Sequence, residues 1–180
     1  MARRLFRILT ALTAFALARD AFAQEGAPAP GTANQAEEIA LLKAEVERLR
    51  SIVPAQAVAM TQVAYNFSNL WFAVEQQNWP LAQFYFNETR TRLRWAMRIA
   101  PVRKISSGEV ELGPLLDVLE QGDLAALGRI VENKDVSQFA GAYDKVLNGC
   151  YGCHVASEKP FLRLKVPAAP AEGMIIFEND

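Results

Sequence analysis

The segment DVSQFAGAYDKVLNGCYGCH, residues 135–154, decides the predicted fold because it combines a helix start, a long apolar face and a cysteine motif. Asp135 is a residue type that caps helix N-termini well. Bulky apolar side chains then recur at steps of three or four residues, as on one face of a helix. They are Phe139, Tyr143, Val146 and Leu147. Because the same spacing continues through Cys150, Cys153 and His154, we expect the motif to face the core.

The motif at the end of this segment is C-x-x-C-H, formed by Cys150, Cys153 and His154. Two thiols at this spacing can add to the two vinyl groups of a haem, while the adjacent imidazole binds the iron. On a helix the three residues occupy positions i, i+3 and i+4 and share one face. The sequence therefore predicts one covalent haem c, attached through both cysteines, with His154 as the proximal iron ligand.

Other uses of the two cysteines fit the sequence less well. A structural zinc site needs four ligands, whereas the whole chain has two cysteines and one histidine. A thioredoxin-like redox pair is expected in a βαβ context, and the pattern here is helical. A structural disulfide across two intervening residues would close a tight, strained loop. We therefore favour haem attachment over these alternatives.

The sequence leaves the sixth position on the iron open. His154 is the only histidine, so ligation by two histidines of one chain is excluded. Besides Met1, the chain has Met60, Met97 and Met174. Each is a candidate sulfur ligand, Met60 and Met174 above all, although methionine on an apolar helix face is more often a core filler. We expect either a methionine or an empty position.

The three segments before residue 135 also show helical periodicity. Apolar faces recur over residues 55–77 and 79–100, and Asn78 between them suits a helix N-cap. A broken helical pattern then covers residues 115–131 and is interrupted near Gly122. This pattern predicts a third helix in one or two pieces.

We therefore predict an all-α protein whose main domain is a four-helix antiparallel bundle over residues 55–160. No alternating run of β-branched residues separates the helices, so we expect no strand. The last residues, 161–180, are rich in Pro and Ala and should form an extended tail over the surface.

An additional amphipathic helix is predicted before the bundle, over residues 36–53. Its apolar residues alternate steps of three and four in a heptad pattern, with charged residues between them. They are Ile39, Leu42, Val46, Leu49 and Val53. A helix of two heptads can either pack against the chain's own bundle or form a homodimer through residues 36–53. Pro54 should end the helix in both cases.

Residues 1–23 have the features of a secretory signal peptide. Three arginines begin the segment, an apolar run up to Leu17 follows, and Ala23 offers a small-residue cleavage site. We expect export to the periplasm, with membrane anchoring if the leader stays uncleaved. Residues 24–35, rich in Pro, Gly and Ala, predict a flexible linker.

The charge of the chain argues against nucleic acid as a partner. The formal net charge is −1, and removal of residues 1–23 takes away four basic residues and one acidic residue, which leaves −4. Such a chain lacks the basic surface that nucleic acid requires.

Arg90, Arg94 and Arg98 form the most basic stretch, at steps of four on one predicted helix, and Arg103 and Lys104 follow nearby. These side chains can bind haem propionates or an acidic redox partner. Alternatively, they form a solvated face that acidic residues of the third helical region neutralise. We favour the second interpretation.

The first two helices of the predicted bundle concentrate aromatic side chains, and a haem needs such apolar walls to exclude water. Phe67 and Trp71 lie on the same face as Met60. We therefore name Phe67 and Trp71 as candidate haem contacts, with ordinary core packing as the alternative.

A C-x-x-C-H motif on the last helix of a four-helix bundle is similar to cytochrome c′, whose haem iron is typically five-coordinate. A second resemblance rests on LWFA at residues 70–73 and NWPLA at residues 78–82. These stretches resemble little-characterised bacterial c-type cytochromes with a C-terminal haem motif. Members of that group often have a histidine a few residues before the first Trp, where this chain has Tyr65-Asn66-Phe67, so the resemblance implies no distal histidine here.

These features predict a periplasmic monohaem c-type cytochrome that transfers electrons through the Fe(II)/Fe(III) couple, with redox proteins as partners. The alternative is a five-coordinate haem protein that binds a diatomic gas, NO or CO, as the resemblance to cytochrome c′ implies. A peroxidase or other enzyme is not expected, because the chain has no second histidine for distal acid–base catalysis.

Overall fold

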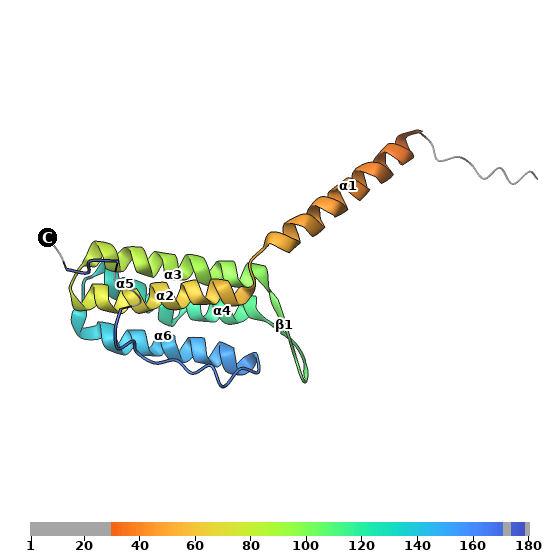
Figure 1. The fold of residues 1–180 in the computed structure, drawn as a ribbon. Coiled ribbons are helices and arrows are strands. Elements are labelled where there is room, and N and C mark those ends of the chain that lie inside the picture. Colours follow the sequence, from red (N-terminus) through yellow and green to blue (C-terminus); the bar gives the residue numbers. More distant parts are fainter. Residues whose placement is uncertain (1–29, 171–173, 179–180) are drawn as a thin grey trace, which may run out of the picture. The chain divides into compact units, whose positions relative to one another are not determined.

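The computed structural model describes residues 30–170 and 174–178 (Figure 1). Most of this part of the chain is helical, and its one sheet is a small two-stranded hairpin, which confirms the predicted all-α class. The predicted leader, residues 1–23, lies outside this part of the chain. No helix among the described residues has the length and apolarity that a membrane crossing needs. The chain divides into two units, Met1–Arg48 and Leu49–Asp180.

The first unit is represented by α1 (Pro30–Ile52), which runs a few residues past the division. This helix corresponds to the one predicted over residues 36–53. It begins earlier, so the prediction of a flexible linker was wrong for residues 30–35. Proline is well tolerated at the first helical position, since the N–H it lacks would have no partner inside the helix. The prediction that Pro54 ends this helix is confirmed.

In the second unit, α2 (Gln56–Glu75) and α3 (Trp79–Ile99) form the most extensive helix pair. A short turn reverses the chain between them. The Asn78 side chain accepts a hydrogen bond from the Leu81 N–H at 3.2 Å, which confirms the predicted N-cap. Pro80 in the first turn of α3 loses no needed hydrogen bond.

A β-hairpin follows α3, where we expected no strand. β1 (Val102–Ile105) and β2 (Gly108–Glu111) pair in antiparallel fashion, with Arg103 opposite Val110. The strands are four residues long and mix charged with apolar side chains, so their alternation was too weak to identify in the sequence. Gly108, with a φ of +141°, provides a backbone conformation at the turn that other residues rarely adopt.

The predicted third helix is present as two pieces, α4 (Leu112–Gln121) and α5 (Asp123–Glu132), which meet at Gly122 as the sequence indicated. Close packing of α5 on α3 depends on a second glycine. A Cβ atom on Gly128 would lie 2.7 Å from the Cζ atom of Phe86, closer than real Cβ contacts come. A larger residue at position 128 would therefore force the buried Phe86 ring to shift.

The last helix, α6 (Val136–Ala156), carries the cysteine motif in its final turns. The Asp135 carboxylate accepts hydrogen bonds from the N–H groups of Ser137 and Gln138 at 3.0 and 3.2 Å, which confirms the predicted N-cap. In Figure 1, α2, α3, the α4–α5 pair and α6 lie side by side. The largest fully buried apolar side chains between them are Leu70, Val74, Tyr85, Leu124, Leu127, Tyr143 and Val146.

The chain after α6 turns back and runs beside that helix (Figure 1). Val166 packs against the core on the way, and Phe177 is only 7 % exposed. The ring of Phe177 lies near those of Phe72 and Tyr85, with centroid distances of 6.1 and 6.3 Å. The tail is therefore anchored near the end of α2, far from the cysteine motif.

Candidate cofactor site

A cavity of about 530 Å³ lies in the second unit beside the end of α6. Its lining comes from α2, α3, β1, α4, α6 and the segment that follows α6. The volume falls within the range of roughly 300–1,000 Å³ that is usual for small-molecule and cofactor sites. Both α2 and α6 line the cavity, and their few mutual contacts leave room for it.

All three residues of the C-x-x-C-H motif line this cavity. Cys150, Cys153 and His154 all lie on α6, at the spacing that places them on one helix face. Both thiols are partly buried, and neither takes part in a disulfide. The motif therefore brings two sulfur atoms and one imidazole to the same space.

The surroundings of the two thiols favour their protonated form. Burial, and to a smaller extent the neighbouring Cys153 thiol, raise the pKa of Cys150 to about 12. Burial also raises the pKa of Cys153, against a smaller opposing effect of its hydrogen bond with Ser157. Redox-active cysteines usually have a lowered pKa, because the thiolate is the reactive form. These environments therefore do not favour a dithiol redox centre.

The chain that follows α6 holds the imidazole of His154. Its Nδ1 atom lies 3.0 Å from the carbonyl oxygen of Leu162. Because a carbonyl oxygen only accepts hydrogen bonds, Nδ1 carries the proton and donates it. The Nε2 atom of the neutral ring is then left with a lone pair that can bind a metal. A second hydrogen bond of this kind fixes the ring and tautomer of most metal-binding histidines.

A tight turn at the end of α6 allows Leu162 to reach His154. The Lys159 N–H donates to the His154 carbonyl at 2.8 Å, the longer of the two bonds of a Schellman motif. Glu158 occupies the left-handed position of this turn, with a φ of +56°, which is costly for a residue other than glycine. Its carboxylate accepts hydrogen bonds from the N–H and hydroxyl groups of Ser106 in the hairpin turn. The hairpin thereby supports the turn.

Most of the remaining lining is apolar. Side chains of α2 and α3 contribute one part of it, and four leucines of α4 contribute another. The apolar residues concerned are Val63, Ala64, Phe67, Leu93, Leu112, Leu115, Leu116 and Leu119. Such walls exclude water, as a porphyrin site requires.

The two aromatic residues named as haem contacts are placed differently. Phe67 lines the cavity, and its ring stacks on that of Tyr143 with a centroid distance of 4.1 Å. Trp71 does not line it. Its ring packs against Phe139 and Tyr143, with centroid distances of 5.6 and 5.0 Å. Trp71 lies one turn beyond Phe67 on α2, where it is partly buried and packs against the hydrophobic core.

The three candidate methionines differ in whether they line the cavity. Met60 and Met97 line the cavity, whereas Met174 does not. The Met174 side chain is 92 % exposed. Burial of nearby Phe177 at the other end of α2 explains why the tail does not bring Met174 to the site. Met97, which the sequence ranked below the other two, is therefore better placed than Met174.

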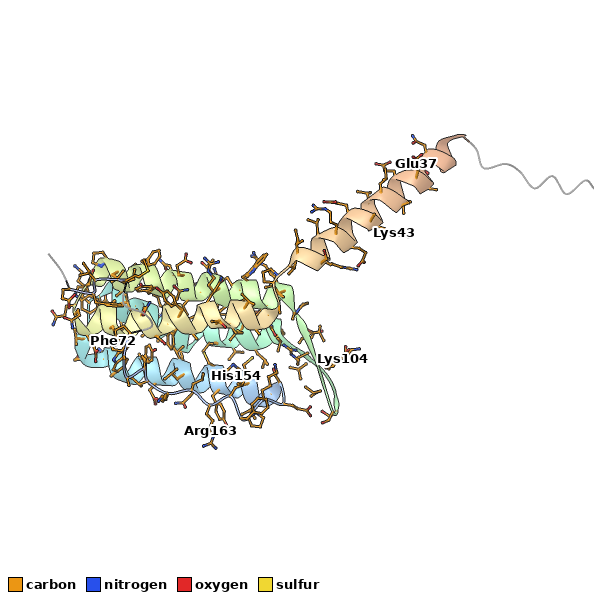
Figure 2. The ribbon with its side chains drawn as sticks, viewed as in Figure 1. Glu37, Lys43, Phe72, Lys104, His154 and Arg163 are labelled. Atoms are coloured by element: carbon orange, nitrogen blue, oxygen red, sulfur yellow. The ribbon has the colours of Figure 1, made fainter. Side chains whose placement is uncertain are left out.

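The charged residues of the lining are all cationic. Among the residues that the structure describes, the cavity has no Asp or Glu in its lining. Its cationic residues are Arg103 from β1 and Lys159, Arg163 and Lys165 from the segment after α6. Figure 2 shows His154 near the end of α6 and Arg163 on the segment that runs beside this helix. An apolar slot with a cationic margin suits a flat apolar ligand that carries anionic groups.

The arginines of α3 serve another purpose. The Arg94 Nε atom lies 2.8 Å from the Glu120 carboxylate of α4, and the Arg90 Nε atom lies 4.0 Å from it. Arg90, Arg94 and Arg98 do not line the cavity. For Arg90 and Arg94, this confirms the interpretation of a surface neutralised by the acidic third region.

Sequence reasoning missed the Leu162 carbonyl, because a backbone contact after a helix end leaves no side-chain signal. It also missed the leucine wall, since the leucines of α4 looked like ordinary core residues. Within the described residues, no three His, Cys, Asp or Glu side chains converge as ligands for a metal ion, so the zinc alternative gains no support. Comparisons of the chain with family models, with curated proteins and with solved structures give no match.

Proposed function

We propose that this chain is a monohaem c-type cytochrome. One observation carries the proposal: Cys150, Cys153 and His154 meet at a single cavity of about 530 Å³, with the Nδ1–H of His154 committed to a backbone carbonyl. The two thiols would form the thioether bonds to the haem vinyl groups, and the Nε2 atom of His154 would bind the iron.

The polarity of the cavity supports a haem. A porphyrin needs apolar walls around its ring and cationic or hydrogen-bonding groups at its two propionates. The leucines of α4 and Phe67 of α2 supply such walls, and Arg103, Lys159, Arg163 and Lys165 supply positive charge without any carboxylate in the lining. This distribution would suit neither a bare divalent cation nor an extended cationic ligand.

We also infer that α2, α3, the α4–α5 pair and α6 form the four-helix antiparallel bundle expected from the sequence. The support is that each packs on its neighbour in chain order and that α6 also packs on α2. The predicted leader supports a periplasmic location, with redox proteins as partners. The heptad pattern of residues 36–53 supports a homodimer as one use of α1.

Electron transfer is the function that this site supports best. When bound, the haem supplies a one-electron Fe(II)/Fe(III) couple. The chain's own residues hold the His154 imidazole in place and exclude water from the cavity. The thioether side chains of Met60 and Met97 are available in the lining as sixth ligands. The Tyr143 hydroxyl also lies in the lining, but it is less available as a ligand because it already donates a hydrogen bond to the Phe67 carbonyl at 2.9 Å.

Spectroscopy of holoprotein purified from a host that matures c-type cytochromes tests this function. The wild type is expected to be six-coordinate and low-spin in both redox states. One of the variants Met60→Leu and Met97→Leu should become high-spin and show a lower midpoint potential, because methionine ligation raises the potential. The other should resemble the wild type and serves as its matched control, as should Met174→Leu. If all three variants keep the wild-type spectrum, methionine ligation is wrong.

Gas binding is the second candidate, and the leucine wall of α4 favours it. An apolar pocket without a strong sixth ligand leaves room for NO or CO. A wild-type ferrous protein that is five-coordinate and high-spin, and that binds CO, would replace electron transfer by gas binding as the proposed function.

A further inference from the structure

Arg103 is held in the cavity lining by a chain of hydrogen bonds. The Gln56 Nε2 atom, at the start of α2, donates to the carbonyl oxygens of Ala96 and Ala100 at 3.0 and 3.3 Å. These bonds use the amide N–H groups and leave the Gln56 Oε1 atom as an acceptor for the Arg103 Nη2 group. The orientation of the guanidinium is therefore set by the end of α3 and the start of α2.

The Nε–H group of Arg103 has no hydrogen-bond partner among the residues that the structure describes. It is also buried. A buried donor without an acceptor destabilises a protein, and more so when it belongs to a charged group. Since Arg103 lines the cavity, the missing acceptor is expected to come from a ligand there.

The chemistry of the missing acceptor follows from the donor. A guanidinium group matches a carboxylate through two parallel N–H···O bonds. No described Asp or Glu lines the cavity to supply that carboxylate from the protein. We propose that Arg103 binds a carboxylate of the bound ligand. Resting on the function proposed above, this carboxylate is a haem propionate.

The hairpin would then act as a clamp across the site. Arg103 on β1 contacts Gln56 of α2, while Ser106 at the hairpin turn holds Glu158 just after α6. A single small element thus supports both the propionate side and the turn that positions His154. This role explains why a hairpin is placed between two helices of an otherwise helical fold.

Lys104 provides a matched control because it carries the same charge on the same strand. Successive strand residues point to opposite faces, and Lys104 is exposed where Arg103 is partly buried. Figure 2 shows Lys104 on the hairpin, directed away from the helices. Lys104 does not line the cavity.

The test compares wild-type holoprotein with R103Q, R103K and K104Q. The readouts are the propionate-bending bands in resonance Raman spectra and the midpoint potential. A cation at a propionate stabilises the more negative, reduced state, so R103Q is expected to lower the potential and shift these bands. R103K, which keeps the charge, should move the potential less than R103Q, and K104Q should match the wild type. If R103Q and K104Q give the same values, Arg103 does not bind the propionate.

If R103Q yields too little holoprotein for these spectra, a second measurement tests the assignment. The chain with Cys150→Ala and Cys153→Ala would be titrated with haem and with haem dimethyl ester, whose propionates are uncharged. With Arg103 present, the ester should bind about tenfold or more weakly, as expected for loss of a charged hydrogen bond. When R103Q is added to this chain, the ratio of the dissociation constants of the ester and of haem should fall toward one. An unchanged ratio would overturn the assignment.

The two proposals fail in different ways. A wild-type protein that holds no haem would overturn the proposed function and this assignment together. A wild-type protein with covalent haem, whose R103Q variant shows neither a lower potential nor a changed ester ratio, would overturn the role of Arg103 alone.

Discussion

Cys150→Ala combined with Cys153→Ala is expected to abolish all haem that survives denaturing electrophoresis. The two thiols are the only cysteines in the chain, and both line the same cavity. Without them no thioether bond can form. The measurement is haem staining of a denaturing gel together with the mass of the intact protein, which should fall by one haem relative to the wild type.

Asn148→Ala is the matched control for this double variant. Asn148 lies on the same helix, two residues before the first cysteine, and its exposed side chain donates a hydrogen bond to Asp144. The control should keep its covalent haem. Helical circular dichroism of both variants would show that a loss of haem is not a loss of fold. Covalent haem that persists in the double variant would rule out attachment through this motif.

Single cysteine variants should each keep one thioether bond. Of the two cysteines, Cys150 is the one that packs against the hydrophobic core. Cys150→Ala should therefore disturb the packing around Tyr143 more than Cys153→Ala does. The comparison is made by urea unfolding of the two holoproteins, and equal midpoints would contradict it.

The course of α6 could be predicted because every signal for it is local. Asp135 bonds to N–H groups two and three residues ahead, and the spacing of the apolar residues extends without a break to the motif. The position of Cys150, Cys153 and His154 on one face follows from helix geometry alone. The same is true of the caps and breaks at Asn78 and Gly122.

The rest of the site depends on contacts between distant residues. Leu162 meets His154 because Glu158 adopts a left-handed conformation. Glycine is the usual residue at such a position, so a glutamate there gives no signal in the sequence. Arg103 looked like one of several surface arginines, and only the unexpected hairpin brings it to the cavity. Trp71 does not line the cavity for a similar reason, since a shared helix face does not tell how far along the helix the cofactor lies.

Substitution of Tyr143 is expected to have the largest effect on stability. This side chain is 1 % exposed and links the core to the cavity through its stack on Phe67. Tyr143→Ala removes a large aromatic group and should lower the free energy of unfolding by about 3–5 kcal/mol. That is a large part of the roughly 5–15 kcal/mol of a typical domain. Urea unfolding of the holoprotein measures it.

Tyr143→Phe isolates the hydroxyl group, whose hydrogen bond to the Phe67 carbonyl is 2.9 Å long. Its loss should cost about 0.5–1.5 kcal/mol. Tyr151→Phe is the matched control, because Tyr151 lies on the same helix and donates to the Pro160 carbonyl at 3.1 Å from a more exposed position. The control should therefore be less destabilised than Tyr143→Phe.

Tyr143→Phe should also change how the stability depends on pH. Burial raises the pKa of Tyr143 above the ordinary value of 10.0, so the unfolded chain ionises first as the pH rises. The contribution of the neutral hydroxyl is fully present below about pH 10 and is lost above it. The stability difference between the wild type and Tyr143→Phe should therefore shrink at alkaline pH. A difference that stays constant from pH 7 to about pH 11 would show that burial does not favour the neutral form of the Tyr143 hydroxyl.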